Sequence, residues 1–267
     1  MVNYYFGASD PGHLRKTNQD WFVSDPQLGI WLVADGVGGR KGGAFASRKA
    51  CEVVFQQFRN GKPIDSAIQY AHRTLKSYQK RPYLDDEMAT TLTVVHLHRG
   101  FCSVYWVGDS RVYLYSNSSL IPLTKDHSFI QSLIDRGEVS SEHAKYHPQR
   151  HVLSQSVGAK DIGCLSIGMT EIAFCKHEKL LLCTDGVSNE LSDFDMERVM
   201  NELSAPRNAV DRFIQRAKEN GGKDNLTALI IAATSHAKRR EGQCIPTIRS
   251  SLPIQFSERI RDLFQWL

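Results

Sequence analysis

The sequence lacks several features that would point to a thiolate-metal, exported or membrane protein. Its six cysteines include no C-x-x-C pair, so they indicate reduced core thiols rather than a zinc site or a disulfide framework. No run of about 18 consecutive apolar residues occurs, and residues 1–9 lack the basic start and long apolar stretch of an export signal. We therefore expect a cytoplasmic chain without stable membrane insertion.

An excess of one sign of charge is also missing. The chain has 33 Lys and Arg against 29 Asp and Glu, a net charge of +4, which is too small to indicate nucleic acid binding but mildly suits an anionic substrate. With 41% hydrophobic and 23% charged residues, the composition is that of a folded globular protein. A length of 267 residues is ordinary for one domain.

Short apolar runs rich in β-branched and aromatic residues predict strands. They occupy residues 4–8, 30–34, 91–97, 103–107, 112–115, 180–183 and 226–232. Apolar residues at helical spacing predict helices over residues 44–58, 64–78, 196–203 and 209–219. Because the strands come in consecutive blocks separated by pairs of helices, the pattern favours an α+β fold, with helical layers around packed sheets, over a doubly wound sheet.

Two segments depart from this pattern. Residues from 126 to about 160 are polar and irregular and contain four histidines, which indicates a functional surface insert. Although His143 and His147 have the spacing of a metal-binding pair on a helix, Pro148 ends any helix there. Apolar residues at helical spacing near the end of the chain predict a linker and an amphipathic C-terminal helix over residues 236–267.

Four aspartates lie where predicted strands begin or end: Asp35, Asp109, Asp185 and Asp224. A rigid strand anchors each carboxylate, and an adjacent glycine or turn lets the backbone approach a ligand closely. Carboxylates that are brought together repel one another unless cations lie between them. Because no His or Cys stands at ligand spacing, such a cluster indicates Mg²⁺ or Mn²⁺ rather than zinc.

Such a centre is suited to the hydrolysis of a phosphoester. Two ions that share a carboxylate lower the pKa of a bound water from ~15.7 toward ~7 and neutralise charge on the phosphoryl oxygens. Arg15, five residues before Asp20 in RKTNQD, is the candidate for holding the phosphate dianion with its planar fork. The glycines of GVGGRKGG fit neither G-x-G-x-x-G nor the P-loop, so a nucleotide site is not indicated.

Eight segments of the chain occur in a recognisable order. They are RKTNQD, VADGVGGRKGGAFAS, ATTLTVV, VGDSRVYLY, LTKDHS, HPQRHVL, LLCTDGVSNEL and GGKDNLTAL. In this order they resemble the bacterial branch of the protein phosphatase 2C-like, metal-dependent family. The resemblance covers roughly residues 4–233. It implies a four-layer α-β-β-α sandwich of two antiparallel sheets flanked by helices, with a phosphatase domain over residues 1–235 and a flap over residues 126–160.

The resemblance also implies a set of metal ligands. Asp35 matches the carboxylate that bridges two Mg²⁺ or Mn²⁺ ions, and the carbonyl of Gly36 matches a ligand of one of them. Asp185 and Asp224 match further ligands, and Asp109 together with Asp185 matches the site of a third, weakly bound ion. All of these side-chain positions are acidic here, so an active enzyme is expected.

The catalytic positions follow in the same way. Asp20 matches a residue that orients metal-bound water, Arg15 matches the phosphate-binding arginine, and Asn225 matches a residue that supports the neighbouring ligand. Two positions depart from the family. Val37 stands where animal members have a histidine, so the general acid assigned to that histidine is missing, and Gln19 replaces an acidic residue.

The function implied by the resemblance is hydrolysis of phosphoserine and phosphothreonine in proteins, by a monomer opposed by a Ser/Thr kinase. No cysteine is followed six residues later by an arginine, which excludes the cysteine-dependent route. Two alternatives stay open: a phosphoprotein-binding pseudo-phosphatase scaffold, and an enzyme for nucleotide or sugar phosphates. His127 and Arg150 are candidates for substrate or scaffold contacts in the flap, whereas His96 and His98 alternate along a strand and are expected to be structural.

Overall fold

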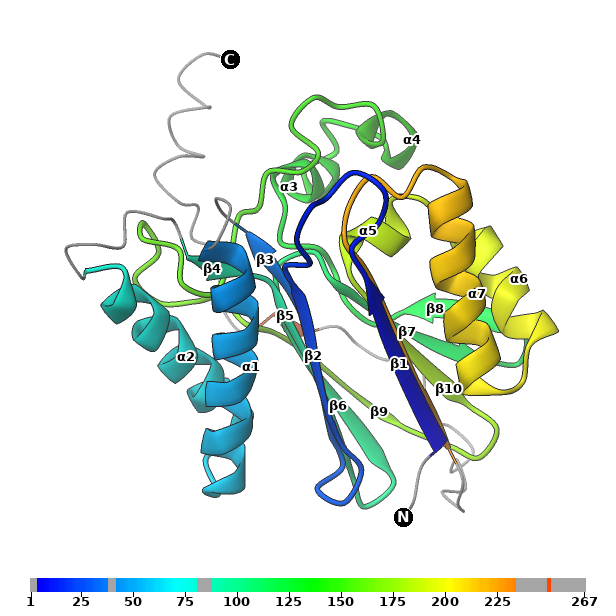
Figure 1. Ribbon diagram of the computed structural model, residues 1–267, viewed down its shortest axis with the longest axis horizontal. Coiled ribbons are helices and arrows are strands. Elements are labelled where there is room, and N and C mark those ends of the chain that lie inside the picture. Colours follow the sequence, from blue (N-terminus) through cyan, green and yellow to red (C-terminus); the bar gives the residue numbers. More distant parts are fainter. Residues whose placement is uncertain (1–3, 38–41, 81–87, 234–248, 251–267) are drawn as a thin grey trace.

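Two antiparallel sheets form the centre of the molecule in the computed structural model, which describes residues 4–37, 42–80, 88–233 and 249–250 (Figure 1). The five-stranded sheet has the order β1 (Tyr4–Asp10), β11 (Leu226–Ala232), β10 (Lys179–Cys183), β7 (Arg111–Ser116) and β8 (Ser119–Pro122). The seven-stranded sheet has the order β12 (Arg249–Ser250), β9 (Gly168–Ala173), β6 (Phe101–Val107), β5 (Leu92–His98), β3 (Ile30–Val37) and β2 (Asp20–Asp25), with β4 (Ala89–Thr90) also paired to β3.

Helices cover the outer face of each sheet. On the seven-stranded sheet lie α1 (Gly42–Arg59) and α2 (Ile64–Tyr78), and on the five-stranded sheet lie α6 (Asp193–Glu202) and α7 (Pro206–Glu219) (Figure 1). The short α5 (Asp185–Ser188) follows β10. The predicted α+β class and the four layers α-β-β-α are therefore confirmed.

The alternation of side chains along the strands explains the layers. On β3, Ile30 and Leu32 pack toward α1 and α2, while Trp31 and Val33 pack into the space between the sheets. On β11, Leu229 faces the other sheet, while its neighbours along the strand face α6 and α7. Because both faces of these strands are buried, they appear in the sequence as continuous apolar runs rather than as alternating ones.

Apart from the C-terminal helix, which lies outside the described residues, the predicted helices and strands are present, with small shifts at their ends. The helix predicted over residues 64–78 is α2 with the same bounds, and the other three begin two to three residues earlier. The sequence did not reveal β2, β4, β8, β9 and β12, or the short helices α3 (Phe129–Asp135), α4 (Ser141–Ala144) and α5. These strands are short or half exposed, so they lack the long apolar run on which the prediction depended.

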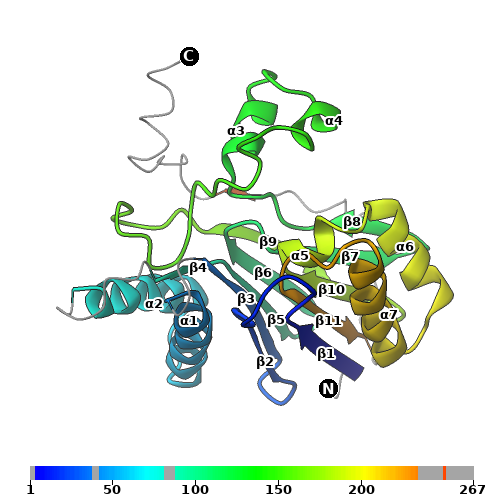
Figure 2. The same ribbon diagram turned by 45° about the horizontal axis from the view of Figure 1, so that its top comes forward.

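Between β8 and β9 the chain leaves the sandwich. Figure 2 shows α3 and α4 standing away from the sheets. This part has its own small core of Phe129, Ile130, Leu133 and Ala144, and the side chain of Ser128 caps α3 by accepting a hydrogen bond from the backbone N–H of Gln131. Of the predicted C-terminal segment, the structure describes only β12, and the predicted amphipathic helix lies outside the described residues.

No helix within the described part of the chain is both long enough and apolar enough to cross a membrane.

Candidate active site

The predicted carboxylates come from both sheets. Asp20 begins β2 and lies opposite Asp35 of β3 in the antiparallel register. Asp109 lies in the turn between β6 and β7, Asp185 begins α5 directly after β10, and Asp224 precedes β11. The negative charges of Asp20, Asp109 and Asp185 all act on Asp35 and raise its pKa. These four side chains therefore lie in one electrostatic neighbourhood.

The backbone of Asp35 is held by two threonines. Its N–H donates to Oγ1 of Thr91 at 3.0 Å, and its carbonyl accepts from Oγ1 of Thr90 at 2.7 Å and from the N–H of Thr91 at 2.8 Å. Oγ1 of Thr91 also lies 2.7 Å from Oγ of Ser110, which follows Asp109. The threonines of ATTLTVV therefore tie the Asp35 strand to the Asp109 turn.

Gly36 must be a glycine because the backbone passes very close to its neighbours. A Cβ atom on this residue would lie 2.3 Å from the carbonyl oxygen of Gly43 and 2.8 Å from that of Gln19. The Gly36 N–H donates to the same Gln19 carbonyl at 3.1 Å. Close packing of β3 against the beginning of α1 thus fixes the Gly36 peptide directly after Asp35.

Asp20 is almost fully buried, and its two carboxylate oxygens differ. Oδ2 accepts hydrogen bonds from Oγ1 of Thr227 at 2.6 Å and from Oγ1 of Thr184 at 2.9 Å. Oδ1 is buried and has no hydrogen-bond partner. Burial raises the pKa of Asp20 to about 7, although the two hydroxyl groups act in the opposite direction. One oxygen of this carboxylate is therefore left for a ligand.

Burial is also the main cause of the raised pKa values of the other central acids. It raises the pKa of Asp35 and Asp109 well above the usual range and raises that of Asp185, with the neighbouring carboxylates as further causes. A side-chain hydrogen bond with Asp35, followed by the charges of His151 and Arg15, lowers the pKa of Asp185 against this effect. Negative charge in this centre is costly without cations.

Arg15 lies at the edge of this centre. Its Nη2 donates to Oδ2 of Asp224 at 2.7 Å, with 54% and 36% of the two side chains exposed. The hydrogen bond to Asp224 raises the pKa of Arg15, and the charges of Asp35 and Asp185 raise it further. The guanidinium is thus close to the carboxylates and also open to solvent, where a phosphate group can reach it.

Asn225 holds the loop that carries Arg15. Its Nδ2 donates to the carbonyls of Pro11 at 3.0 Å and Thr17 at 3.1 Å, and its Oδ1 accepts from the N–H of Gln19 at 2.8 Å. The side chain is 4% exposed. Asn225 therefore binds the loop at both ends, a wider role than support of the neighbouring Asp224.

An ion pair that was not predicted from the sequence lies beside Asp109. Arg111 donates from Nε and Nη2 to the two carboxylate oxygens of Asp126, at 2.9 and 2.7 Å. Next to it, the N–H of His127 donates to the carbonyl of Gly108, so the first residues of the insert are tied to the Asp109 turn. Opposite charges within the neighbouring motifs GDSR and LTKDHS were the signal that could have revealed this pair. His127 is buried and acts as a scaffold contact, whereas Arg150 is exposed.

The other histidines hold no metal site within the described ranges. No group of three or more His, Cys, Asp or Glu side chains there is arranged to hold an ion. His98 contacts Ser103 and Glu171, and the ring of His96 lies edge-on to that of Phe58. These contacts agree with the structural role predicted for the pair.

Within the described ranges the carboxylates, like the histidines, do not form a group of three or more side chains that is arranged to hold an ion. Their chemistry nevertheless fits hard divalent cations, because the donors are oxygens only and one buried oxygen, Oδ1 of Asp20, has no partner. A further oxygen, Oδ2 of Asp224, is bound to Arg15. The residues that are present therefore fit Mg²⁺ or Mn²⁺.

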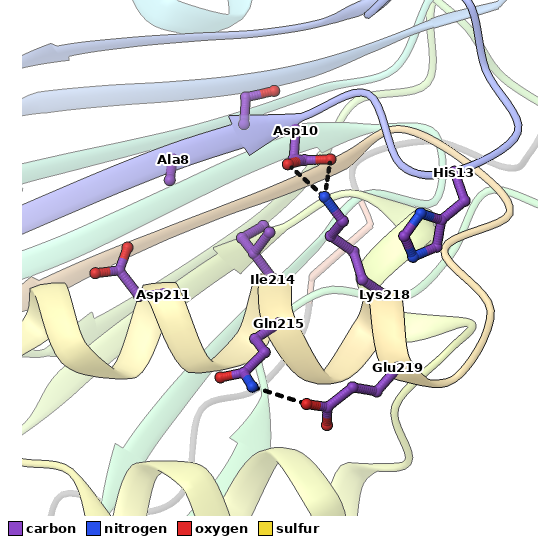
Figure 3. A pocket seen from close by; sticks show the side chains of 9 residues that line it. Ala8, Asp10, His13, Asp211, Ile214, Gln215, Lys218 and Glu219 are labelled. Carbon is purple, nitrogen blue, oxygen red and sulfur yellow. Dashed lines mark hydrogen bonds and ion pairs between the residues drawn. The ribbon is translucent and has the colours of Figure 1, made fainter.

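A hollow of 560 Å³ lies elsewhere, between β1 and α7. One ion pair lies within it: Figure 3 shows the Lys218 ammonium reaching across to the Asp10 carboxylate, and the nitrogen lies 3.0 and 3.2 Å from the two oxygens. His13 lies at one end, and none of the predicted metal ligands lines the hollow. The carboxylate centre, rather than this hollow, has the groups for catalysis.

A buried carboxylate centre with an accessible arginine at its edge, held between two sheets, is the arrangement of a metal-dependent phosphatase. Residues 13–230 match the profile of the family described as Protein phosphatase 2C. The serine/threonine phosphatase stp of Listeria monocytogenes serotype 4b (strain F2365) is 30% identical over 246 residues, which cover 87% of this chain and 97% of that protein. This chain belongs to the protein phosphatase 2C family.

Solved structures agree with this assignment. The crystal structure of the Mycobacterium tuberculosis serine/threonine phosphatase PstP/Ppp has a TM-score of 0.79 at 27% identity and covers 87% of this chain and 99% of that one. The catalytic domain of PstP in complex with two manganese ions has a TM-score of 0.75 at 26% identity, covering 86% and 98% of the two chains. The predicted family, fold, enzyme class and use of Mg²⁺ or Mn²⁺ are confirmed.

Proposed function

We propose that this chain hydrolyses phosphoserine and phosphothreonine in proteins, with two divalent ions bound by Asp35, the Gly36 carbonyl, Asp185 and Asp224. A third ion is bound weakly by Asp109 and Asp185. The observation that carries the proposal is the burial of several carboxylates within electrostatic range of one another, which raises their pKa values and calls for cations. The family membership and the names of the relatives support the same reaction.

When bound, the ions would activate a water and would neutralise charge on the phosphoryl oxygens. The residues of the chain place the reactants. Arg15 releases Asp224 and holds two phosphoryl oxygens with its planar fork, for which its exposure leaves room. Asp20 accepts a hydrogen bond from the attacking water through Oδ1, the oxygen that has no protein partner. The water oxygen bonds to phosphorus as the bond to the serine or threonine oxygen breaks, and the proton that this water loses passes to solvent.

The leaving oxygen must gain a proton. Val37, at the end of β3 and 37% exposed, has none to give, so we assign this role to a solvent water. This differs from family members that have a histidine at the corresponding position.

We also propose the division of the chain and its setting. Residues 1–235 form the catalytic unit, and residues 126–160 form a flap that contacts the substrate. The base of the flap supports this, because Arg111 and Asp126 tie it to the Asp109 turn. The enzyme acts as a cytoplasmic monomer on phosphoproteins and opposes a Ser/Thr kinase.

The test is the rate of phosphate release from a phosphothreonine peptide as Mn²⁺ is titrated. We expect turnover to depend on Mn²⁺, to be lost in Asp224→Asn, and to be retained in the matched control Asp211→Asn, because Asp211 is an exposed acid on α7. Nucleotide and sugar phosphates serve as competing substrates. Binding of the peptide without turnover would identify a pseudo-phosphatase scaffold instead, and faster turnover of the small phosphates would reassign the substrate.

A further inference from the structure

A ring of hydrogen bonds surrounds the Asp20 carboxylate and joins the two sheets. Thr227 on β11 and Thr184, directly after β10, both contact Oδ2 of Asp20 from the five-stranded sheet, while Asp20 itself begins β2 of the seven-stranded sheet. Both threonines are fully buried. Neither threonine is a candidate site residue from the sequence alone.

The donors and acceptors of this ring follow from the number of protons available. A threonine hydroxyl has one proton, and in both residues it goes to Oδ2 of Asp20, at 2.6 Å from Thr227 and 2.9 Å from Thr184. Oγ1 of Thr227 lies 2.7 Å from Oγ of Ser9, so Ser9 must be the donor there. Ser9 in turn accepts from Nδ2 of Asn18 at 2.7 Å.

Asn18 closes the ring. Its Oδ1 accepts from the backbone N–H of Asp20 at 3.1 Å. The bonds therefore all run one way, from Asp20 N–H to Asn18, Ser9, Thr227 and back to Oδ2 of Asp20. Thr184 braces the ring from the side, because its Oγ1 accepts from the N–H of Thr227 at 3.1 Å while it donates to Asp20.

The arrangement has a consequence for Oδ1. Two donors on Oδ2 prevent rotation of the carboxylate, so the buried Oδ1 stays without a protein partner. Among the neighbouring charges, that of Asp20 acts most strongly on Asp35, so this carboxylate belongs to the same centre. A contact needed only to fasten the sheets together would not require one oxygen to be left unpaired, since such an oxygen is destabilising.

We propose that Thr184 and Thr227 are positioning residues, which hold Oδ2 of Asp20 so that Oδ1 serves the attacking water, with Ser9 and Asn18 extending this control to the Arg15 loop. The inference rests on the proposed function for the role of the water. The ring itself passes through Asn18, three residues after Arg15. It therefore links Asp20, which orients the attacking water, to the loop whose arginine holds the phosphate.

The experiment compares Thr227→Val and Thr184→Val, which remove one hydroxyl at nearly constant shape, with Thr227→Ser, which keeps it. The matched control is Thr170→Val, because Thr170 is a buried threonine on β9 whose hydroxyl has no partner. Each protein is measured for Mn²⁺ affinity by calorimetry, for kcat and KM on a phosphothreonine peptide, and for thermal unfolding in EDTA.

We expect each Val variant to lower kcat by about 10-fold to 100-fold and to weaken Mn²⁺ binding, as is usual when a partner of a metal-site residue is lost. KM for the peptide should change less than kcat. Thr227→Ser should stay within about threefold of the wild type, and Thr170→Val should be indistinguishable from it. Ser9→Ala, which changes an exposed residue, should show a smaller loss of kcat than Thr227→Val.

Unchanged kcat and Mn²⁺ affinity in the folded Val variants would overturn the proposal, as would an equal loss in Thr170→Val. If the Val variants do not fold, Ser9→Ala decides: a lowered kcat supports the ring, and an unchanged kcat refutes it. Failure of the proposed function looks different, since the wild type would then show no Mn²⁺-dependent turnover. The calorimetric comparison of Mn²⁺ affinities would still test the positioning of Asp20.

Discussion

The two sheets differ in how the negative charges that they contribute to the centre are stabilised. On the seven-stranded sheet, Asp20 and Asp35 lie side by side on paired strands, and burial raises both pKa values. On the five-stranded sheet, Asp224 lies in an open loop, and its carboxylate is bound to the exposed Arg15. Asp20 and Asp35 depend on cations from solution, whereas Asp224 has the Arg15 cation beside it. Removal of a charge from Asp35 should therefore change stability differently from removal of a charge from Asp224.

The largest effect is expected from Asp35→Asn and Asp224→Asn. Both changes should lower kcat/KM at fixed Mn²⁺ by at least about 100-fold, because a direct ligand matters more than the outer partners that support it. In EDTA the two should differ. Asp35→Asn removes a carboxylate that burial and neighbouring charges disfavour, so its melting temperature should rise, whereas Asp224→Asn removes the partner of Arg15 and should bring no such rise.

Thermal unfolding of the metal-free proteins, followed by circular dichroism, checks this contrast. Equal melting temperatures for Asp35→Asn and the wild type in EDTA would contradict the idea that the buried side is strained by its charge. A rise in both variants would show that the two sides do not differ.

A smaller effect is expected from Arg15→Lys. Lysine keeps the charge but loses the planar fork, so one of two charged hydrogen bonds to the phosphate is lost, which corresponds to about a tenfold rise in KM for a phosphothreonine peptide. Steady-state kinetics at saturating Mn²⁺ measure it. Lys16→Ala, which removes the neighbouring exposed cation, is the control and should leave KM unchanged. A rise of equal size in both would mean that only the net charge of the loop matters.

The sequence predicts the acids of this centre well, because each stands at the end of a strand or at a turn that strong apolar runs define. Asp35 follows IWLVA and Asp185 follows LLLCT, so their positions follow from the strands alone. The elements that the sequence does not reveal are short and polar, as with β2, in which Asp20 opens a run of only three apolar residues. The family resemblance, rather than periodicity, identified Asp20.

The hydrogen-bond partners were not predictable for a different reason. Thr184 and Asp20 are separated by 164 residues in sequence, and Thr227 and Asp20 by 207. Buried threonines are also common within strands, where their β-branched side chains pack well. Only the packing of the two sheets, which places β2 next to the ends of β10 and β11, shows that both hydroxyl groups contact one carboxylate.

The raised pKa of the buried Asp20 should make the stability of the metal-free protein depend on pH. The pKa of Asp20 is raised from 3.8 to about 7 in the fold, so between these values the folded protein binds more protons than the unfolded chain. The stability of the metal-free protein should therefore fall as pH rises from about 4 to about 7. His72 and His127 act in the opposite direction, since burial lowers their pKa values from 6.5 to about 4.

The quantity to measure is thus the difference in melting temperature between the wild type and Asp20→Asn. Melting temperatures from pH 4.5 to 7.5 in EDTA should show the wild type losing stability relative to the variant as pH rises. Saturating Mn²⁺ should remove or reverse this trend, because the metal competes with protons for the carboxylates. A difference that does not depend on pH in EDTA would mean that Asp20 stays ionised in the fold.

The smallest effect is expected at the hollow between β1 and α7, outside both sides of the centre. Lys218 and Asp10 form an ion pair there with about a third of each side chain exposed, and such pairs contribute about 0–1 kcal/mol. Lys218→Gln should lower the melting temperature by no more than about 2–4 °C and leave kcat and KM unchanged. The loop of Arg15 also begins beside this pair, since the N–H of Gly12 donates to Asp10 at 2.9 Å. A tenfold change in KM would therefore show that the pair controls Arg15, and Asn225 would then not be sufficient to hold the loop.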